Sequence, residues 1–187
     1  MATKKKTKKS KTLAAARKKK SSTGKASASA RRPSGPVVDR IIPHLIVNDG
    51  ARALAFYKAA FGAEEAERMT TPDGRLMHGE VRFAGHRLFV SDEFSESEGG
   101  TCRAPRTLGG TCVRITLEVD DADAVAKRAV AAGAELLMPV AKMFWGGRYG
   151  KVRDPFGHEW GLNQQVRALT AAEGKAAADA FFRGRRH

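Results

Sequence analysis

The sequence predicts an α+β fold of two βαβββ modules, whose paired curved mixed sheets surround a cleft, preceded by a disordered basic N-terminal tail. The main observation is an internal repeat. Residues 47–64 and 119–135 both run from a valine, through an acidic turn and an Ala-rich stretch, to Gly-Ala-Glu. Val47 and Val119 lie 72 residues apart, and the Gly-His pairs at 85–86 and 157–158 keep that spacing. A fixed period of this kind indicates two copies of one folding unit.

The second observation is the distribution of charge. Residues 1–36 contain thirteen Lys/Arg and no acidic residue, although the whole chain has a net charge of +14. A segment so polar cannot bury an apolar core, so we expect disorder there. Its cations would attract a polyanion, and residues 4–32 are therefore a candidate for non-specific nucleic-acid contact. A solubilising tail is the alternative.

The elements of the first module follow from local signals. Asp49 is a candidate N-cap, and Gly62 a candidate helix stop. Pro72, Asp73 and Gly74 form a hairpin-turn signal. We therefore expect strands at 41–47, 64–69, 76–83 and 87–91 and a helix at 50–61.

The second module repeats this order after a polar connection at 92–111. We expect strands at 112–119, 134–140, 148–152 and 158–163 and a helix at 121–132, followed by an accessory helix from Thr170. The domain organisation is then a tail at 1–36, a domain at 37–167 made of modules 37–93 and 111–167, and an accessory C-terminal helix and tail at 168–187.

Composition limits the location of the chain. Cys102 and Cys112 suggest neither a disulfide framework nor a zinc site. No apolar run approaches 18 residues, and the basic N-terminus lacks the apolar segment of a secretory signal. We expect a cytoplasmic protein, with nucleoid association through the tail as an additional possibility.

Strand alternation predicts which side chains face the cleft. Val113, Ile115, Leu117 and Val119 should face the helix, so the residues between them face the cleft. The last strand behaves likewise, and the repeat extends the pattern to the first module. The predicted cleft-facing residues are Ile42, His44, Ile46, Arg87, Phe89, Ser91, Arg114, Thr116, Glu118, Glu159, Gly161 and Asn163. An open, solvated sheet face would alternate in the same way.

Several short motifs resemble the vicinal oxygen chelate superfamily, which includes glyoxalase I, extradiol dioxygenases and bleomycin-resistance proteins, and within it the PhnB-like branch. They are Pro43-His44-Leu45, Ala55–Lys58 with Phe61-Gly62-Ala63, Met77–Glu80, the segment 120–135, Trp145–Gly150 and Arg153–Trp160. The resemblance covers about 39–165. It implies paired βαβββ modules and a homodimer.

The resemblance also implies where a metal would bind. Enzymes of the family hold a divalent ion with His or Glu from four strands, and those positions are Ile42, Phe89, Arg114 and Gly161 here. None offers an imidazole or carboxylate donor. We expect no cofactor; the alternative is a divalent metal at a shifted site among His44, His78, Glu80 and Glu159.

The preferred hypothesis is therefore a protein that binds a small polar or aromatic ligand in the cleft without a metal. The candidate ligand-binding residues are His44, Phe89, Arg114, Thr116, Glu118, Trp145, Arg148, Tyr149, Glu159 and Asn163. Arg148 has a surface ion pair as its alternative role. The competing hypotheses are a lyase, isomerase or dioxygenase with a shifted metal site, and a nucleic-acid-associated protein that uses the basic tail. Whether the chain is an enzyme stays open.

Overall fold

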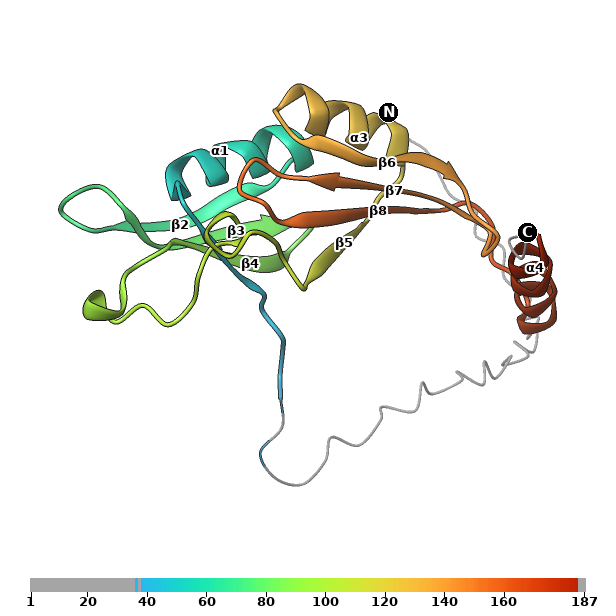
Figure 1. Cartoon of the computed structure of the whole chain (residues 1–187), viewed down its shortest axis with the longest axis horizontal. Coiled ribbons are helices and arrows are strands. Elements are labelled where there is room, and N and C mark those ends of the chain that lie inside the picture. Colours follow the sequence, from blue (N-terminus) through green and yellow to red (C-terminus); the bar gives the residue numbers. More distant parts are fainter. Residues whose placement is uncertain (1–35, 37, 185–187) are drawn as a thin grey trace, which may run out of the picture. The chain divides into compact units, whose positions relative to one another are not determined.

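The computed structural model describes residues 36 and 38–184, and Arg40 begins a compact unit that contains all their helices and strands. The predicted basic tail lies almost entirely outside the described residues. Two four-stranded sheets, A and B, make up the unit (Figure 1). Sheet A has the order β1 (His44–Val47), β4 (His86–Asp92), β3 (Leu76–Phe83) and β2 (Glu64–Thr70). Sheet B has the order β5 (Arg114–Glu118), β8 (Glu159–Gln165), β7 (Gly147–Arg153) and β6 (Glu135–Lys142).

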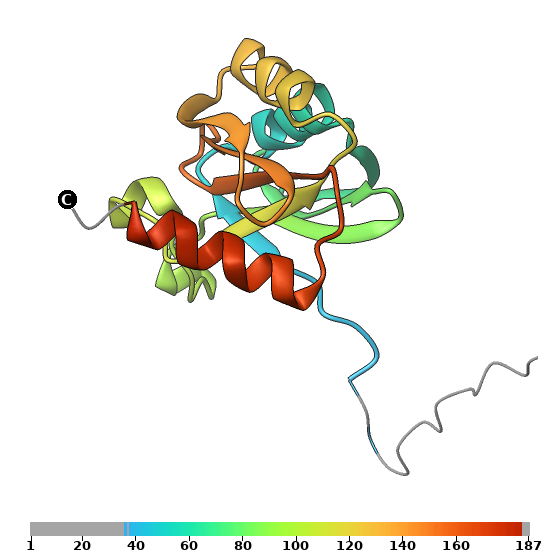
Figure 2. The same cartoon turned by 90° about the vertical axis from the view of Figure 1, so that its right-hand side faces the viewer.

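Each module contributes one helix, α1 (Gly50–Phe61) or α3 (Ala122–Ala131). The two helices lie beside each other on the same side of the sheets (Figures 1 and 2). Asp49 caps α1 by accepting from the Arg52 amide at 3.0 Å, and Asp121 caps α3 by accepting from the Ala124 amide at 2.9 Å. Such caps satisfy amides that have no partner within the helix. The predicted two-module fold is confirmed.

The repeat extends to the strand register. His44 on β1 pairs with Phe89 on β4, and 72 residues later Thr116 on β5 pairs with Gly161 on β8. Both pairs belong to the single parallel ladder of their sheet, and the remaining ladders are antiparallel. Residues at equivalent positions of the two modules therefore point to the same side of their sheets.

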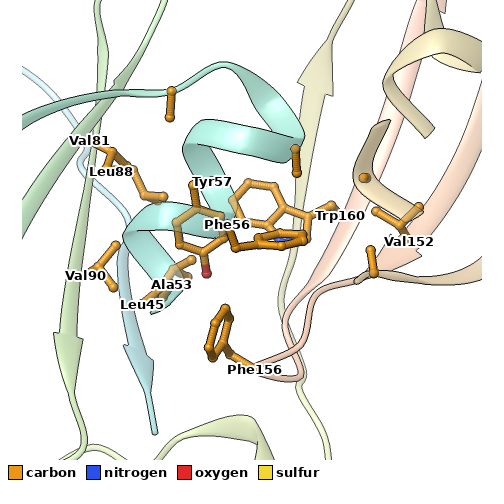
Figure 3. Close-up of a cluster of buried hydrophobic side chains, with 14 of the residues drawn as sticks. Leu45, Ala53, Phe56, Tyr57, Val81, Leu88, Val90, Val152, Phe156 and Trp160 are labelled. Atoms are coloured by element: carbon orange, nitrogen blue, oxygen red, sulfur yellow. The ribbon is translucent and has the colours of Figure 1, made fainter. Parts of the chain in front are cut away.

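The apolar sides of both sheets pack on the helices in one continuous core. Tyr57 and Trp160 are fully buried and lie near its centre (Figure 3), and Leu54 is 1% exposed. The Trp160 ring contacts Phe61 of α1, with centroids 4.8 Å apart, although the two residues belong to different modules. Full burial of a large apolar side chain stabilises the folded state by about 1.5–3 kcal/mol. The modules therefore share the core that holds them together.

A buried carboxylate joins the modules at the centre of this core. Asp154 Oδ2 accepts from the Tyr57 hydroxyl at 3.0 Å and from the Trp160 indole N–H at 2.9 Å. Its Oδ1 accepts from the amides of Phe156 and His158, both at 2.9 Å. Asp154 thus shapes the turn between β7 and β8 and also links β8 to α1.

The burial of Tyr57 has a measurable consequence. Desolvation, followed by the charge of Asp154 and the hydrogen bond to it, raises the pKa of Tyr57 well above its usual value of 10.0. The unfolded chain therefore loses the phenol proton first, and stability falls as the pH rises above 10. Absorbance at 295 nm should show no ionisation of Tyr57 until the fold is lost. In a Tyr149→Phe variant only Tyr57 can give the signal, since the chain has 2 tyrosines; ionisation near pH 10 in the folded state would contradict the assignment.

Several boundaries differ from the expectations. β1 begins at His44, not Ile41, which is 86% exposed. β5 begins at Arg114, so Val113 is 62% exposed and does not face α3 as predicted. The connection at 92–111 contains two short helices, η1 (Glu96–Glu98) and α2 (Pro105–Leu108). Both strand errors arise because apolar residues just outside a ladder look like strand residues in the sequence.

The accessory helix is α4 (Ala171–Arg183), which begins after the Thr170 cap. Phe181 contacts Phe144 at the β6–β7 turn, with ring centroids 4.8 Å apart. Phe182 of α4 also contacts the Phe144 ring, with centroids 6.0 Å apart, although no residue of α4 is buried. None of the helices within the described part of the chain is long and apolar enough to span a bilayer.

Candidate ligand-binding site

The polar side of sheet B, called face B below, points away from α3. Strand pairing puts Arg153 opposite Glu159, Lys151 opposite Gly161 and Tyr149 opposite Asn163. Paired residues share a side, and alternation places the buried Val152 and Trp160 on the other one. Face B consists of Arg114, Thr116, Glu118, Tyr149, Lys151, Arg153, Glu159, Gly161 and Asn163.

Glu159 is the centre of an ion-pair network on face B. Its Oε2 accepts from Arg114 at 2.8 Å, and its Oε1 accepts from Arg153 at 3.3 Å. The hydrogen bond from Arg114 is the main reason that the pKa of Glu159 lies below 4.5, and Arg153 adds to it. Glu159 is therefore negatively charged at neutral pH, and the positive charges of Arg114 and Arg153 compensate its charge.

Gly161 has no room for a side chain. A Cβ atom built there would lie 2.6 Å from the Tyr149 hydroxyl oxygen and 2.8 Å from Thr116 Oγ1. Real Cβ atoms do not approach other atoms so closely, so a larger residue would have to displace Tyr149. The two hydroxyl groups therefore occupy the space that a side chain at Gly161 would take.

Two further contacts complete face B. The side-chain amide of Asn163 donates to both carboxylate oxygens of Glu118 at 2.9 Å, and both hydrogen bonds lie at the surface. The Trp145 ring meets the Tyr149 ring edge-on, with centroids 6.0 Å apart. Trp145 is 38% exposed, so it adds an accessible aromatic surface next to the polar residues.

The equivalent side of sheet A, called face A, is more aromatic. His44 lies 3.2 Å from Ser91 Oγ, measured from Nε2, and its ring centroid is 5.9 Å from that of Phe89. The Phe89 ring also contacts His78, with centroids 4.7 Å apart. Burial, and secondarily the neighbouring His78, lowers the pKa of His44 below 6.5. His44 is therefore neutral at physiological pH.

Glu80 on face A is held by two arginines. It accepts from Arg87 at 2.5 Å and from Arg82 at 2.8 Å, and its side chain is 3% exposed. The hydrogen bond from Arg87 is the first cause of its lowered pKa, followed by that from Arg82. Arg87 also lies over the Phe89 ring, 4.9 Å from its centroid. The guanidinium groups, not an apolar environment, thus cover the carboxylate.

These contacts test whether the residues present fit a divalent metal. Of the four shifted-site candidates, Glu159 lies on the other sheet from His44, His78 and Glu80, and both carboxylates are already bound by arginines. Within residues 38–184, no three His, Cys, Asp or Glu side chains are grouped so that they could hold an ion. At the position of the eighth-strand ligand, Gly161 faces the Tyr149 hydroxyl. The donor set does not fit.

The predicted site residues separate into three places. Arg114, Thr116, Glu118, Tyr149, Glu159 and Asn163 come together on face B, with Trp145 at its edge. His44 and Phe89 lie together on face A. Arg148 lies on the helix side, where it pairs with Asp123 of α3 at 2.7 Å, in agreement with the alternative role named for it.

Sequence reasoning missed Lys151 and Arg153 on face B and Arg82 on face A. The signal was present, because β7 alternates Tyr149, Lys151 and Arg153 on one side with Arg148 and Val152 on the other. When strand alternation is applied to β7 as well as to β5 and β8, Lys151 replaces Arg148 among the predicted ligand-binding residues.

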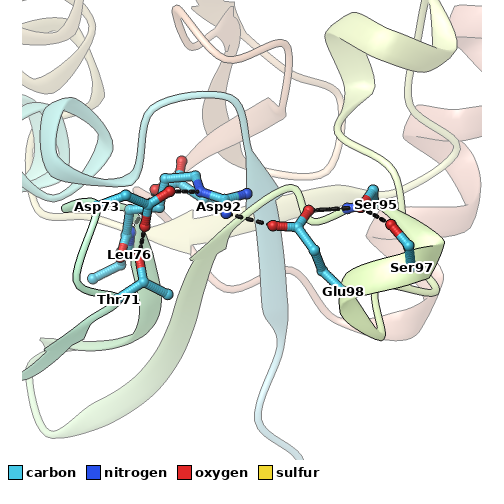
Figure 4. A network of polar contacts seen from close by, with 8 residues as sticks. Thr71, Asp73, Leu76, Asp92, Ser95, Ser97 and Glu98 are labelled. Atoms are coloured by element: carbon cyan, nitrogen blue, oxygen red, sulfur yellow. Dashed lines mark hydrogen bonds and ion pairs between the residues drawn. The ribbon is translucent and has the colours of Figure 1, made fainter.

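A separate hollow of about 560 Å³ lies outside both faces. It is bordered by the start of α1, the β2–β3 turn and the connection after β4, and Asp73, Arg75, Asp92, Phe94 and Glu98 are among its lining residues. Its polar groups bond to one another: Arg75 bridges Asp73 and Glu98, and Asp92 accepts from the Leu76 amide at 2.6 Å (Figure 4). This network fastens the connection to module 1.

Comparison with known proteins agrees with this architecture. A model of the Glyoxalase/Bleomycin resistance protein/Dioxygenase superfamily matches residues 37–162. An uncharacterized protein of Mycobacterium bovis is 44% identical over 135 residues, which cover 72% of this chain and 89% of that protein. An uncharacterized protein of Arabidopsis thaliana is 31% identical over 125 residues, or 63% of this chain and 73% of that protein.

Solved structures show the same fold. The Arabidopsis thaliana gene product aligns with a TM-score of 0.52 and 30% identity, over 67% of this chain and 98% of that one. TioX from Micromonospora sp. ML1 aligns with a TM-score of 0.54 and 24% identity, over 69% of this chain and 100% of that one. The family model covers more than half of the chain, and the two-module fold agrees with it: this chain belongs to the Glyoxalase/Bleomycin resistance protein/Dioxygenase superfamily.

Proposed function

We propose that the chain binds a small polar or aromatic molecule on its polar sheet faces, without a metal ion. The observation that carries this proposal is the contact at Gly161. Where metal-dependent relatives would place a ligating side chain, the Tyr149 and Thr116 hydroxyls fill the space. Ile42, Phe89 and Arg114 stand at the other three positions. Faces A and B therefore offer hydrogen-bond donors, charges and aromatic surface, but no set of metal ligands among the described residues.

A homodimer is part of the proposal. Arg114, Thr116 and Glu118 are all exposed in the single chain, and among the described residues no hydrogen bond or ion pair connects face A with face B. The contacts that join the modules lie elsewhere, such as the bond from Arg128 to the Ala60 carbonyl at 2.7 Å. A second copy laid against these faces would close a cleft that one chain leaves open.

The test is a screen of small polar and aromatic compounds by ligand-observed NMR, on the full chain in EDTA. We expect some compounds to bind the wild-type chain in EDTA and to lose their affinity for the Gly161→Leu variant, because the new side chain fills face B. Gly110→Leu is the matched control, since no described residue places an atom within 4 Å of a Cβ at Gly110. Binding that appears only after Zn²⁺, Mn²⁺ or Ni²⁺ is added, or bound metal near one ion per chain, would refute the proposal and favour the metal-dependent alternative.

The predicted contact of residues 4–32 with nucleic acid rests on the thirteen cations of the N-terminal segment. It lies outside the described residues and stays a prediction.

A further inference from the structure

We propose that the molecule bound on face B is an anion with one negatively charged group, of the carboxylate class, and that Lys151 binds this group. The inference rests on the proposed function and names its ligand class. It concerns a residue that no sequence motif identified.

Lys151 differs from the other cations of face B in its pairing. Arg114 and Arg153 are both paired with Glu159, and Arg153 also binds Glu135 at 2.9 Å. Lys151 is half-buried, yet its ammonium group forms no hydrogen bond or ion pair with any of the residues that the structure describes. An ammonium group without a partner on its own chain is free to form a charge-assisted hydrogen bond with an anionic ligand.

The surroundings of Lys151 suit a carboxylate. Its cross-strand neighbour is Gly161, so no side chain lies between the two strands at this point. The Tyr149 and Thr116 hydroxyls converge on Gly161, and each can donate a hydrogen bond to an oxyanion. The cross-strand partner of Lys151 is therefore the glycine beside which two hydroxyl groups lie.

The other end of face B disfavours a second negative charge. Glu118 is hydrogen-bonded by the Asn163 amide, which is neutral, so its negative charge remains. Asn163 lies two residues beyond Gly161 on β8, which is about 7 Å along a strand. A ligand longer than this would bring its far end near a carboxylate, and the exposed Trp145 ring offers an aromatic contact instead.

The experiment compares three probes of equal size: benzoate, benzamide and benzylamine. Their affinities for the full chain are measured by ligand-observed NMR in EDTA, with circular dichroism to verify folding of each variant. We expect benzoate to bind at least tenfold more tightly than benzamide, and benzylamine to bind most weakly. Lys151→Met should reduce benzoate affinity to that of benzamide, and Lys151→Arg should retain most of it. Lys142→Met, at an exposed lysine of β6, is the control and should change nothing.

The outcomes separate this inference from the proposed function. If benzamide binds as well as benzoate, or if Lys151→Met leaves benzoate affinity unchanged, the anion assignment is wrong although face B still binds ligands. The assignment also fails if benzoate does not bind the wild-type chain at all. The proposed function itself fails separately, if every compound found in the screen binds the Gly161→Leu variant as tightly as it binds the wild-type chain.

Discussion

Replacing Asp154 with alanine is expected to lower the free energy of unfolding by about 4 kcal/mol, because buried donors are left without an acceptor. Four donors converge on this carboxylate, from Tyr57, Phe156, His158 and Trp160. Asp154 itself is 3% exposed, so water cannot readily replace it. Asp154→Asn should also destabilise, by about 2 kcal/mol, since its NH2 group would face donors instead of accepting from them.

Urea unfolding monitored by circular dichroism measures the effect. Asp121→Ala is the control, because Asp121 also accepts a hydrogen bond from a backbone amide but lies at the surface as the cap of α3. Its loss should cost only about 1 kcal/mol. If the two alanine variants are equally stable, Asp154 does not hold the modules together in the way described.

Replacing Gly50 with alanine is expected to destabilise the chain by about 2–3 kcal/mol, the usual cost of overpacking a core. A Cβ atom at Gly50 would meet Leu76 Cβ and would lie 2.7 Å from Leu76 Cδ2. Neither side can yield easily, because Asp92 binds the Gly50 amide at 2.7 Å and the Leu76 amide at 2.6 Å. The first turn of α1 is therefore fixed against β3.

Gly174→Ala is the matched control, because it also replaces a helical glycine with alanine. Gly174 lies within α4, and the described residues leave open space around a Cβ placed there. Alanine should stabilise that helix by about 0.5–1 kcal/mol, since it restricts the unfolded chain. Thermal unfolding of both variants should move in opposite directions. A Gly50→Ala variant as stable as the wild type would show that α1 can shift away from β3.

The internal repeat is the reason that the fold could be predicted from the sequence. Both modules contain an aspartate cap before the helix and a glycine with positive φ after it, Asp49 with Gly62 and Asp121 with Gly133, and these are local signals. Because equivalent residues lie 72 positions apart, the strand pairing expected in one sheet also predicts the pairing in the other. Most of face B could be predicted from β5 and β8 because their alternation is regular.

The features that were not predicted depend on contacts between distant residues. Nothing in the sequence shows that Asp154 reaches Tyr57, which lies 97 residues earlier. The same is true of Glu93, which fastens the connection after β4 by accepting from the Ala104 amide at 2.9 Å and from Thr107. Strand alternation on β7 would have placed Lys151 on face B, but only the three-dimensional arrangement shows that Arg114 and Arg153 are paired with carboxylates.

The hydrogen bonds of Asp154 also bear on how the two halves diverged. By the 72-residue spacing, the first-module equivalents of Asp154 and Trp160 are Arg82 and Leu88. Arg82 is half exposed and donates to the buried Glu80 carboxylate, and Leu88 packs as an ordinary aliphatic residue. The backbones are still duplicates, but their interiors have become complementary. A tandem of two identical first halves would lack both the acceptor and the indole, so this shared core requires one copy of each half.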